Sequence, residues 1–336
     1  CQTMAVFIPD DVRGEEAVQY FRDHKEYLDL LLRKQSEMAE LVCTPGDIER
    51  ITAEGRCAVI LAVESGAALA GSLDNVDYLA ANGVKMMTLV WNGPNELGSG
   101  QKTDQGLTPF GRQAVKRMEE AGIIVDVSHL NDRGFGELCE IAEKPFIATH
   151  SNLRSVCSHK RNLTEEQFKE MINRKGLVGV NLYEQFLADD HKGDLDSMYR
   201  HVSRMLELGG EDIIACGSDF DGADIDETLD TPVKFARSAE YLLTRGISER
   251  TIDKMFFENN PFEAVKKHTD LNGLQKIRKL LALDRADEER ENINTQAIAI
   301  LKDPHILAVA IQANRWVLTP LWFELIEEGR RDGSIQ

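Results

Sequence analysis

Seven short apolar runs, separated by longer amphipathic stretches, dominate residues 1–268 of this chain. Each run is continuously apolar rather than alternating, which is typical of parallel β-strands that are covered on both faces. The pattern therefore predicts an α/β fold, either a doubly wound sheet or a (β/α) barrel. The predicted strands cover residues 3–8, 58–63, 86–90, 123–127, 146–149, 177–182 and 213–216.

The stretches between these runs carry apolar residues at helical spacing and predict the helices of the fold. Thr108 followed by Pro109 is typical of a helix start, and Thr164 with Gln167 three residues later forms a capping-box pattern. The predicted helices cover residues 13–42, 73–81, 109–121, 132–142, 164–173, 195–208 and 232–268.

A closed barrel of the common kind has eight parallel strands, whereas seven are predicted here. We therefore expect a TIM-type (β/α)8 barrel that lacks its first strand, with an N-terminal truncation as the reason. This barrel is expected to span residues 1–268 as one domain.

Residues 269–336 differ in character, because they contain no predicted strand and form an all-α C-terminal segment. The last predicted helix is strongly apolar around Leu318, Leu321 and Trp322. It either caps the barrel or belongs to a separate helical module that buries this face against a partner. Since a module of this size cannot comfortably bury such a face alone, we expect a homodimer.

The charge balance limits the possible partners. The chain has 39 Lys and Arg against 57 Asp and Glu, a net charge of −18. Because nucleic acids and anionic membranes bind basic surfaces, we expect neither as a partner. The six cysteines contain no CxxC pair, so reduced, mostly buried thiols and a cytoplasmic location are expected. A lipid-modified Cys1 in an exported protein is the alternative.

Polar residues that can do chemistry follow the predicted strand ends. In barrel enzymes this carboxyl-terminal rim carries the catalytic residues. Glu64, His129 and His150 follow three different strands, and two imidazoles with a carboxylate form a standard zinc ligand set. An arginine in a polar loop, Arg161, is either solvent-exposed or a clamp for a carboxylate. The other rim residues are Trp91, Asn92, Tyr183 and Asp219.

The remaining histidines are expected to be solvated or to lie on a helix face; they are His24, His159, His191, His201 and His305. His268 and Asp270 have the spacing of a metal-binding His-x-Asp pair. They end an amphipathic helix instead of a buried strand, so we interpret the spacing as a coincidence.

Residues 1–268 resemble the membrane (renal) dipeptidase family of binuclear zinc hydrolases, within the amidohydrolase superfamily. The family's two metal-binding histidines are 21 residues apart, as are His129 and His150. A substrate-binding arginine follows by 11 residues, as Arg161 does, and an aspartate follows by 58 more, as Asp219 does. The segments that carry the resemblance are AVESG, MMTLVWN, VDVSH, ATHSNLRSVCSHKRNLT, VGVNLY and GSDFDG.

The resemblance implies zinc-dependent hydrolysis of dipeptides by a metal-activated water. Glu64 would bridge two zinc ions, and His129 and His150 would complete the second zinc site. Arg161 would hold the substrate's C-terminal carboxylate, and Asp219 would act on the attacking water or the departing amine. Trp91 and Asn92 would face the substrate.

Three departures from the family pattern limit this expectation. The family's His-x-Asp belongs on the first strand, which we expect to be missing, so at most one zinc would be well held. A substrate-contacting histidine of the animal enzymes corresponds to Trp91, and a tyrosine that binds the substrate carboxylate falls at Phe186. Two alternatives remain: another metal-dependent amidohydrolase, or an inactive barrel scaffold whose helical tail dimerises or binds a ligand. The tail is similar to the ligand-binding and dimerisation region of tetracycline-repressor-like regulators.

Overall fold

The computed structural model describes residues 1–258. The predicted domain boundary at residue 268, the helical tail with its expected homodimer contact, and the His268–Asp270 pair lie outside the described residues. They remain predictions from the sequence.

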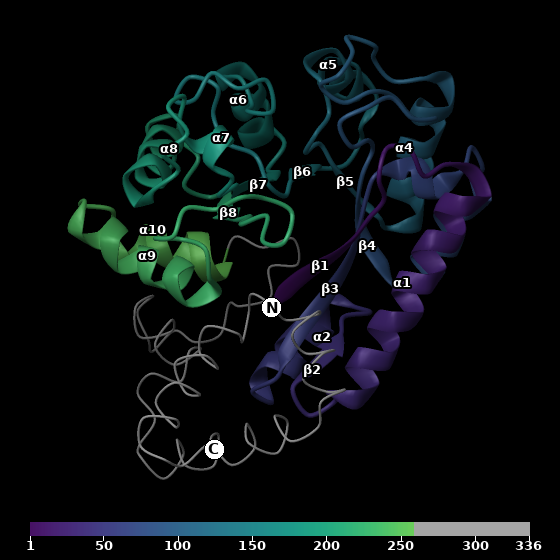
Figure 1. Ribbon diagram of the computed structural model, residues 1–336, viewed down its shortest axis with the longest axis horizontal. Helices are drawn as coiled ribbons and strands as arrows, with labels where there is room; N and C mark the ends of the chain where they lie inside the picture. Colours follow the sequence, from purple (N-terminus) through teal and green to yellow (C-terminus); the bar gives the residue numbers. More distant parts are fainter. Residues whose placement is uncertain (259–336) are drawn as a thin grey trace.

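One parallel sheet organises the described chain, in the order β1-β3-β4-β5-β6-β7-β8, with β2 paired to β3 off this path. The sheet curls, and helices lie along its outer side (Figure 1). The prediction of an α/β barrel-type fold is therefore confirmed, and the described strands form a curled half-barrel of eight strands, one more than predicted. Its strands are β1 Gln2–Phe7, β2 Ala39–Leu41, β3 Cys57–Glu64, β4 Val84–Thr88, β5 Ile124–Asp126, β6 Ile147–Ala148, β7 Leu177–Val180 and β8 Ile214–Cys216.

The strand β1 differs from its prediction as a buried strand. Thr3 and Ala5 are exposed, whereas Val6 is buried. β1 is an end strand that pairs only with β3 among the described strands. One face of β1 is therefore left uncovered by the described residues over its first half.

The predicted helix over 13–42 is wrong in its last third. Helix α1, Gly14–Lys34, ends earlier, and β2 follows it. Met38, which lies between them, is 42% exposed. A three-residue strand is too short to show its own periodicity, and its pairing with the start of β3 holds it in place.

A second helix, α2 Pro45–Ala53, was missed altogether. Its start is a capping box, because the backbone N–H of Thr44 donates to Asp47 Oδ2 at 2.7 Å. The Thr-Pro-Gly-Asp sequence carries this signal, so the helix could have been predicted.

Most other helices match the predictions. Thr108 caps α4, Pro109–Ala121, by accepting from the backbone N–H of Gly111 at 2.9 Å. Thr164 and Gln167 form the predicted capping box at the start of α6. The remaining elements are η1 Gly66–Leu69, α3 Asp74–Ala81, α5 Asp132–Ile141, α6 Glu165–Asn173, α7 Glu184–Leu187 and α8 Leu195–Glu207.

The predicted helix over 232–268 is broken in the described chain. α9, Pro232–Thr244, is followed by α10, Glu249–Asp253, and a π-helical turn, Lys254–Glu258. Gly246 separates α9 from α10 with a φ of 89°. A left-handed glycine just past a helix is a common way to end it.

The core lies on both faces of the sheet, as the continuous apolar runs require. In β3, Leu61 and Val63 pack into the larger cluster with the surrounding helices. Ile60 and Ala62 point to the opposite face, where they meet Ile48 of α2. Successive side chains of a strand alternate between faces, so a strand with core on both sides must be apolar throughout.

The cysteines are all free thiols, but the expectation that they are mostly buried is wrong. Cys157 is buried and Cys139 half-buried, while the other four are exposed. Among residues 1–258, no helix combines the length and the apolarity needed to cross a bilayer.

Candidate metal centre

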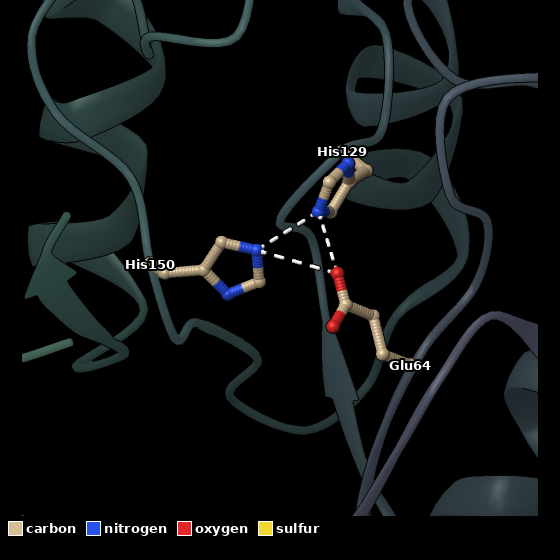
Figure 2. Close-up of side chains that lie close together, drawn as sticks. All are labelled: Glu64, His129 and His150. Atoms are coloured by element: carbon tan, nitrogen blue, oxygen red, sulfur yellow. Dashed lines mark hydrogen bonds and ion pairs between the residues drawn. The ribbon is translucent and has the colours of Figure 1, made fainter. Parts of the chain in front are cut away.

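Three side chains that could bind a metal meet at the carboxyl-terminal rim of the sheet. Glu64 is the last residue of β3, His129 lies three residues beyond β5, and His150 lies two residues beyond β6. Because parallel strands end at the same rim, residues distant in sequence converge there. Figure 2 shows the Glu64 carboxylate and the two imidazole rings pointing at one another.

The distances within this cluster are short. His129 Nε2 lies 2.8 Å from Glu64 Oε1 and 2.9 Å from His150 Nε2. His150 Nε2 lies 3.8 Å from the same oxygen of Glu64. One ligand atom from each residue falls within 4.8 Å of the others. Two nitrogens and one carboxylate oxygen that converge in this way fit a zinc-like divalent metal.

Burial favours the neutral, metal-binding form of the first histidine. His129 is 7% exposed and His150 is 8% exposed. Burial holds the pKa of His129 well below its usual range, and the nearby Arg161 cation lowers that pKa further. A metal-binding imidazole must be unprotonated at the ligand nitrogen, so this environment suits a ligand.

Three residues in or next to this cluster have strained backbone conformations with positive φ. Ser65, His129 and Asp219 have φ values of 97°, 72° and 65°, in the left-handed region that non-glycine residues rarely adopt. Such conformations cost about 1–3 kcal/mol each and are concentrated at functional sites. Ser65, directly after Glu64, is held because its backbone N–H donates to Thr88 Oγ1 at 2.7 Å.

A buried cation lies beside the cluster. Arg161 is 5% exposed, and its Nη2 donates to the backbone oxygen of His150 at 3.4 Å. Its Nε has no hydrogen-bond partner among residues 1–258. Burial lowers the pKa of Arg161, while Asp219 and Glu64 oppose this shift. Of the two alternatives for Arg161, solvent exposure is therefore excluded, and the guanidinium has an unused donor in a buried position.

The carboxylate of Asp219 is held in a fixed direction. Asn181, which is fully buried, donates from Nδ2 to Asp219 Oδ2 at 3.0 Å. Asn181 Oδ1 in turn accepts from the backbone N–H of Tyr183 at 2.6 Å. Oδ1 of Asp219 is therefore the oxygen that remains for other contacts.

The two residues predicted to face a substrate, Trp91 and Asn92, make different contacts in the structure. Trp91 packs edge-on against Phe7 at 4.8 Å between ring centroids, and its ring lies 6.2 Å from the His129 ring. Asn92 Oδ1 lies 3.2 Å from His129 Nδ1, on the side of the ring away from Glu64. Asn92 thus contacts a candidate metal ligand.

Phe186, at the position of the family's tyrosine, contacts the buried cation. The Arg161 guanidinium lies 5.3 Å from the centroid of the Phe186 ring. Tyr183 packs against the same ring at 4.7 Å between centroids. Phe186 offers no hydroxyl to a ligand here, but its ring face supports the cation.

Three polar residues around the cluster were not singled out from the sequence: Asp126, Thr149 and Asn181. Asp126 is 3% exposed and interrupts the apolar run 123–127. A charged residue inside a buried strand is the signal that could have identified it, since an unpaired buried charge is costly. Thr149 and Asn181 lie directly after strand residues and carry no comparable signal.

One histidine lies on a helix, as predicted, but is not solvated. His201 on α8 is fully buried. Its Nδ1 accepts from the backbone N–H of Leu153 at 3.2 Å, and its Nε2 lies 3.0 Å from the backbone oxygen of Leu187. His201 therefore ties the loop that carries Arg161 to α8.

Comparison of the chain with known proteins identifies a matching family. The family model described as membrane dipeptidase (peptidase family M19) matches residues 1–271. A protein from Klebsiella pneumoniae, described as uncharacterized in the pqqA 5′ region, is 30% identical over 241 residues, 68% of this chain and 89% of its own length. A protein from Acinetobacter calcoaceticus, from the PQQ-III 3′ region, is 32% identical over 54% of this chain and 61% of its own length.

Solved structures share the fold. The dipeptidase AC, a metallopeptidase of family M19, is 26% identical with a TM-score of 0.74, covering 78% of this chain and 85% of its own. A metallopeptidase from Rhodobacter sphaeroides, liganded with a phosphinate mimic of L-Ala-D-Ala, is 24% identical with a TM-score of 0.74, covering 78% and 86%. An amidohydrolase from Pseudomonas aeruginosa has a TM-score of 0.69 at 22% identity, covering 83% and 88%.

Proposed function

The chain belongs to the membrane dipeptidase family, peptidase family M19, and we propose that it hydrolyses dipeptides at the Glu64–His129–His150 cluster with zinc as the metal. Membership in this family makes it a metal-dependent dipeptidase. Zinc is the metal favoured by two imidazole nitrogens and one carboxylate oxygen. A bound zinc ion would supply a water of lowered pKa and polarise the scissile carbonyl.

The observation that carries the dipeptide assignment is the unsatisfied guanidinium of Arg161. A buried cation with an unused donor is costly unless an anion meets it. Arg161 touches the backbone of His150, so an anion bound there lies close to the metal ligands. The C-terminal carboxylate of a short peptide matches this position, since a guanidinium binds a carboxylate through two parallel hydrogen bonds.

Asp219 is the residue we assign to proton transfer. Hydrolysis adds the hydroxyl of water to the carbonyl carbon, and its proton must reach the departing amine nitrogen. Asp219 Oδ1 takes this proton and delivers it, while Asn181 holds Oδ2. A carboxylate fixed beside the reacting atoms suits general acid–base catalysis.

A dipeptide of two small residues is the first substrate to test. The structural neighbour from Rhodobacter sphaeroides carries a mimic of L-Ala-D-Ala. Arg161 and the Glu64–His129–His150 cluster fix the two ends of a short substrate. A longer peptide would place its C-terminal carboxylate beyond the reach of Arg161.

The test is kcat/KM of the purified full chain, with zinc added, for Ala-Ala dipeptides, the tripeptide and the C-terminally amidated dipeptide. We expect turnover of free dipeptides, loss of turnover in Glu64→Gln, and normal turnover in His24→Ala, an exposed control on α1. Preferred turnover of the amidated compound would favour the second candidate, a metal-dependent amidohydrolase of other amides. Zinc bound normally by both Glu64→Gln and His150→Ala would overturn the proposed site.

A further inference from the structure

Behind His150 lies a buried hydrogen-bond chain. Asp126 Oδ1 accepts from the backbone N–H groups of Ser128 at 2.9 Å and Thr149 at 3.0 Å. Asp126 Oδ2 accepts from the Thr149 hydroxyl. Thr149 Oγ1 lies 2.8 Å from His150 Nδ1. The chain thus runs from a carboxylate, through a hydroxyl, to an imidazole.

This chain leaves one proton arrangement for His150. An ionised carboxylate only accepts hydrogen bonds, and a hydroxyl has a single proton to donate. The Thr149 proton therefore goes to Asp126, and Thr149 can only accept from the ring. A neutral His150 ring therefore carries its proton on Nδ1, which leaves a bare lone pair on Nε2.

The Nδ1 atom of the second histidine, His129, also has a hydrogen-bond partner. Asn92 Oδ1 lies 3.2 Å from His129 Nδ1. An amide oxygen is an acceptor, so His129 also carries its proton on Nδ1. Its Nε2 likewise presents a lone pair toward Glu64 and His150.

We propose that Asn92, and Thr149 together with Asp126, are positioning residues that fix both histidines in the Nδ1-protonated tautomer and so prepare the site for its metal. The inference rests on the proposed metal site. With both protons on Nδ1, the two Nε2 lone pairs, 2.9 Å apart, and the Glu64 oxygen face one another without a proton between them. Such an arrangement is repulsive until a cation lies between the three atoms.

Thr149 gives the sharpest test, because Asp126 also holds backbone N–H groups and its loss would disturb the fold. Thr149→Val removes the hydroxyl and keeps the branched shape, whereas Thr149→Ser restores the hydroxyl. Outer partners of metal-binding histidines typically contribute about 10–100-fold in metal affinity. Asn92→Leu removes the acceptor on His129, and Asn92→Asp retains one.

The measurement is zinc affinity of the full chain, by competition with a chromogenic chelator, beside the thermal unfolding midpoint of the metal-free protein. We expect Thr149→Val and Asn92→Leu to remain folded, with a cooperative thermal transition, and to bind zinc about 10–100-fold more weakly, and Thr149→Ser to bind like the wild type. Wild-type zinc affinity in Thr149→Val overturns the inference. Equal weakening in Thr149→Val and Thr149→Ser overturns it as well.

A second readout needs no variant. In the metal-free wild-type protein with ¹⁵N-labelled histidine, NMR distinguishes a protonated ring nitrogen from a bare one. We expect His129 and His150 to show protonated Nδ1 and bare Nε2, and a bare Nδ1 on either ring overturns its assignment. Normal zinc binding by Glu64→Gln and His150→Ala would instead count against the proposed metal site, so the two failures are distinguishable.

Discussion

The Nε2 atoms of His129 and His150 lie 2.9 Å apart, although the residues follow different strands, β5 and β6. Adjacent parallel strands bring their carboxyl ends side by side, so each strand contributes one ring. His129 reaches this position with a left-handed backbone, at a φ of 72°. The contact therefore depends on the turn after β5 as well as on the sheet.

The first prediction concerns zinc stoichiometry. Among residues 1–258, one cluster of three possible metal ligands is found, Glu64 with His129 and His150. We expect the purified 336-residue chain to hold one zinc ion tightly, and Glu64→Gln to lower that content. Elemental analysis of protein prepared without chelator measures it. Two tightly bound ions per chain would contradict the prediction.

The second prediction concerns the buried cation. Arg161→Lys replaces a two-pronged donor with a point charge and should reduce kcat/KM for free dipeptides. Loss of a buried charged pair typically costs about 2–5 kcal/mol, or roughly 30-fold or more. The C-terminally amidated dipeptide should lose much less. Equal losses for both substrates would show that Arg161 does not bind the carboxylate.

The third prediction separates proton transfer from metal binding. Asp219→Asn keeps the hydrogen bond that Asn181 donates but cannot accept the proton from water. General acid–base groups contribute about 10²–10⁴-fold, so kcat should fall by that factor while zinc affinity stays normal. Asp224→Asn, an exposed neighbour, serves as the control. A variant that loses zinc together with activity would assign Asp219 to the metal instead.

The fourth prediction concerns acid stability. Burial lowers the pKa of His201 to about 4. The unfolded chain takes up this proton near pH 6.5, so the unfolded state binds more protons between these values. The free energy of unfolding should therefore fall with decreasing pH in this window, by about 1.4 kcal/mol per unit and about 3 kcal/mol in all.

Urea unfolding of the metal-free chain at pH 7, 6 and 5 measures this effect. His201→Asn, which keeps an acceptor for the backbone of Leu153, should show a shallower dependence on pH than the wild type. His24→Asn, an exposed control, should follow the wild type. Identical slopes for His201→Asn and the wild type would contradict the assignment.

The sequence alone determined seven of the eight described strands and the residues at the rim. A strand buried on both faces has to be apolar throughout, so local composition marks it without knowledge of its neighbours. The parallel arrangement then places residues such as Glu64, His129 and His150 at one end of the sheet. Thr108 and Thr164 marked their helices for a similar reason, since a cap depends on residues three positions away.

Only the tertiary structure decided which residues hydrogen-bond to the Nδ1 atoms of His129 and His150. The partner of His129 Nδ1 comes from the loop after β4, and the partner of His150 comes from β5 through Thr149. Burial of His201 depends on the loop at Leu153 and on the end of α7 at Leu187, which approach α8 from two places. These contacts join segments distant in sequence and depend on strand register and loop path. Such relationships leave no local pattern in the sequence, because each exists only after the sheet has assembled.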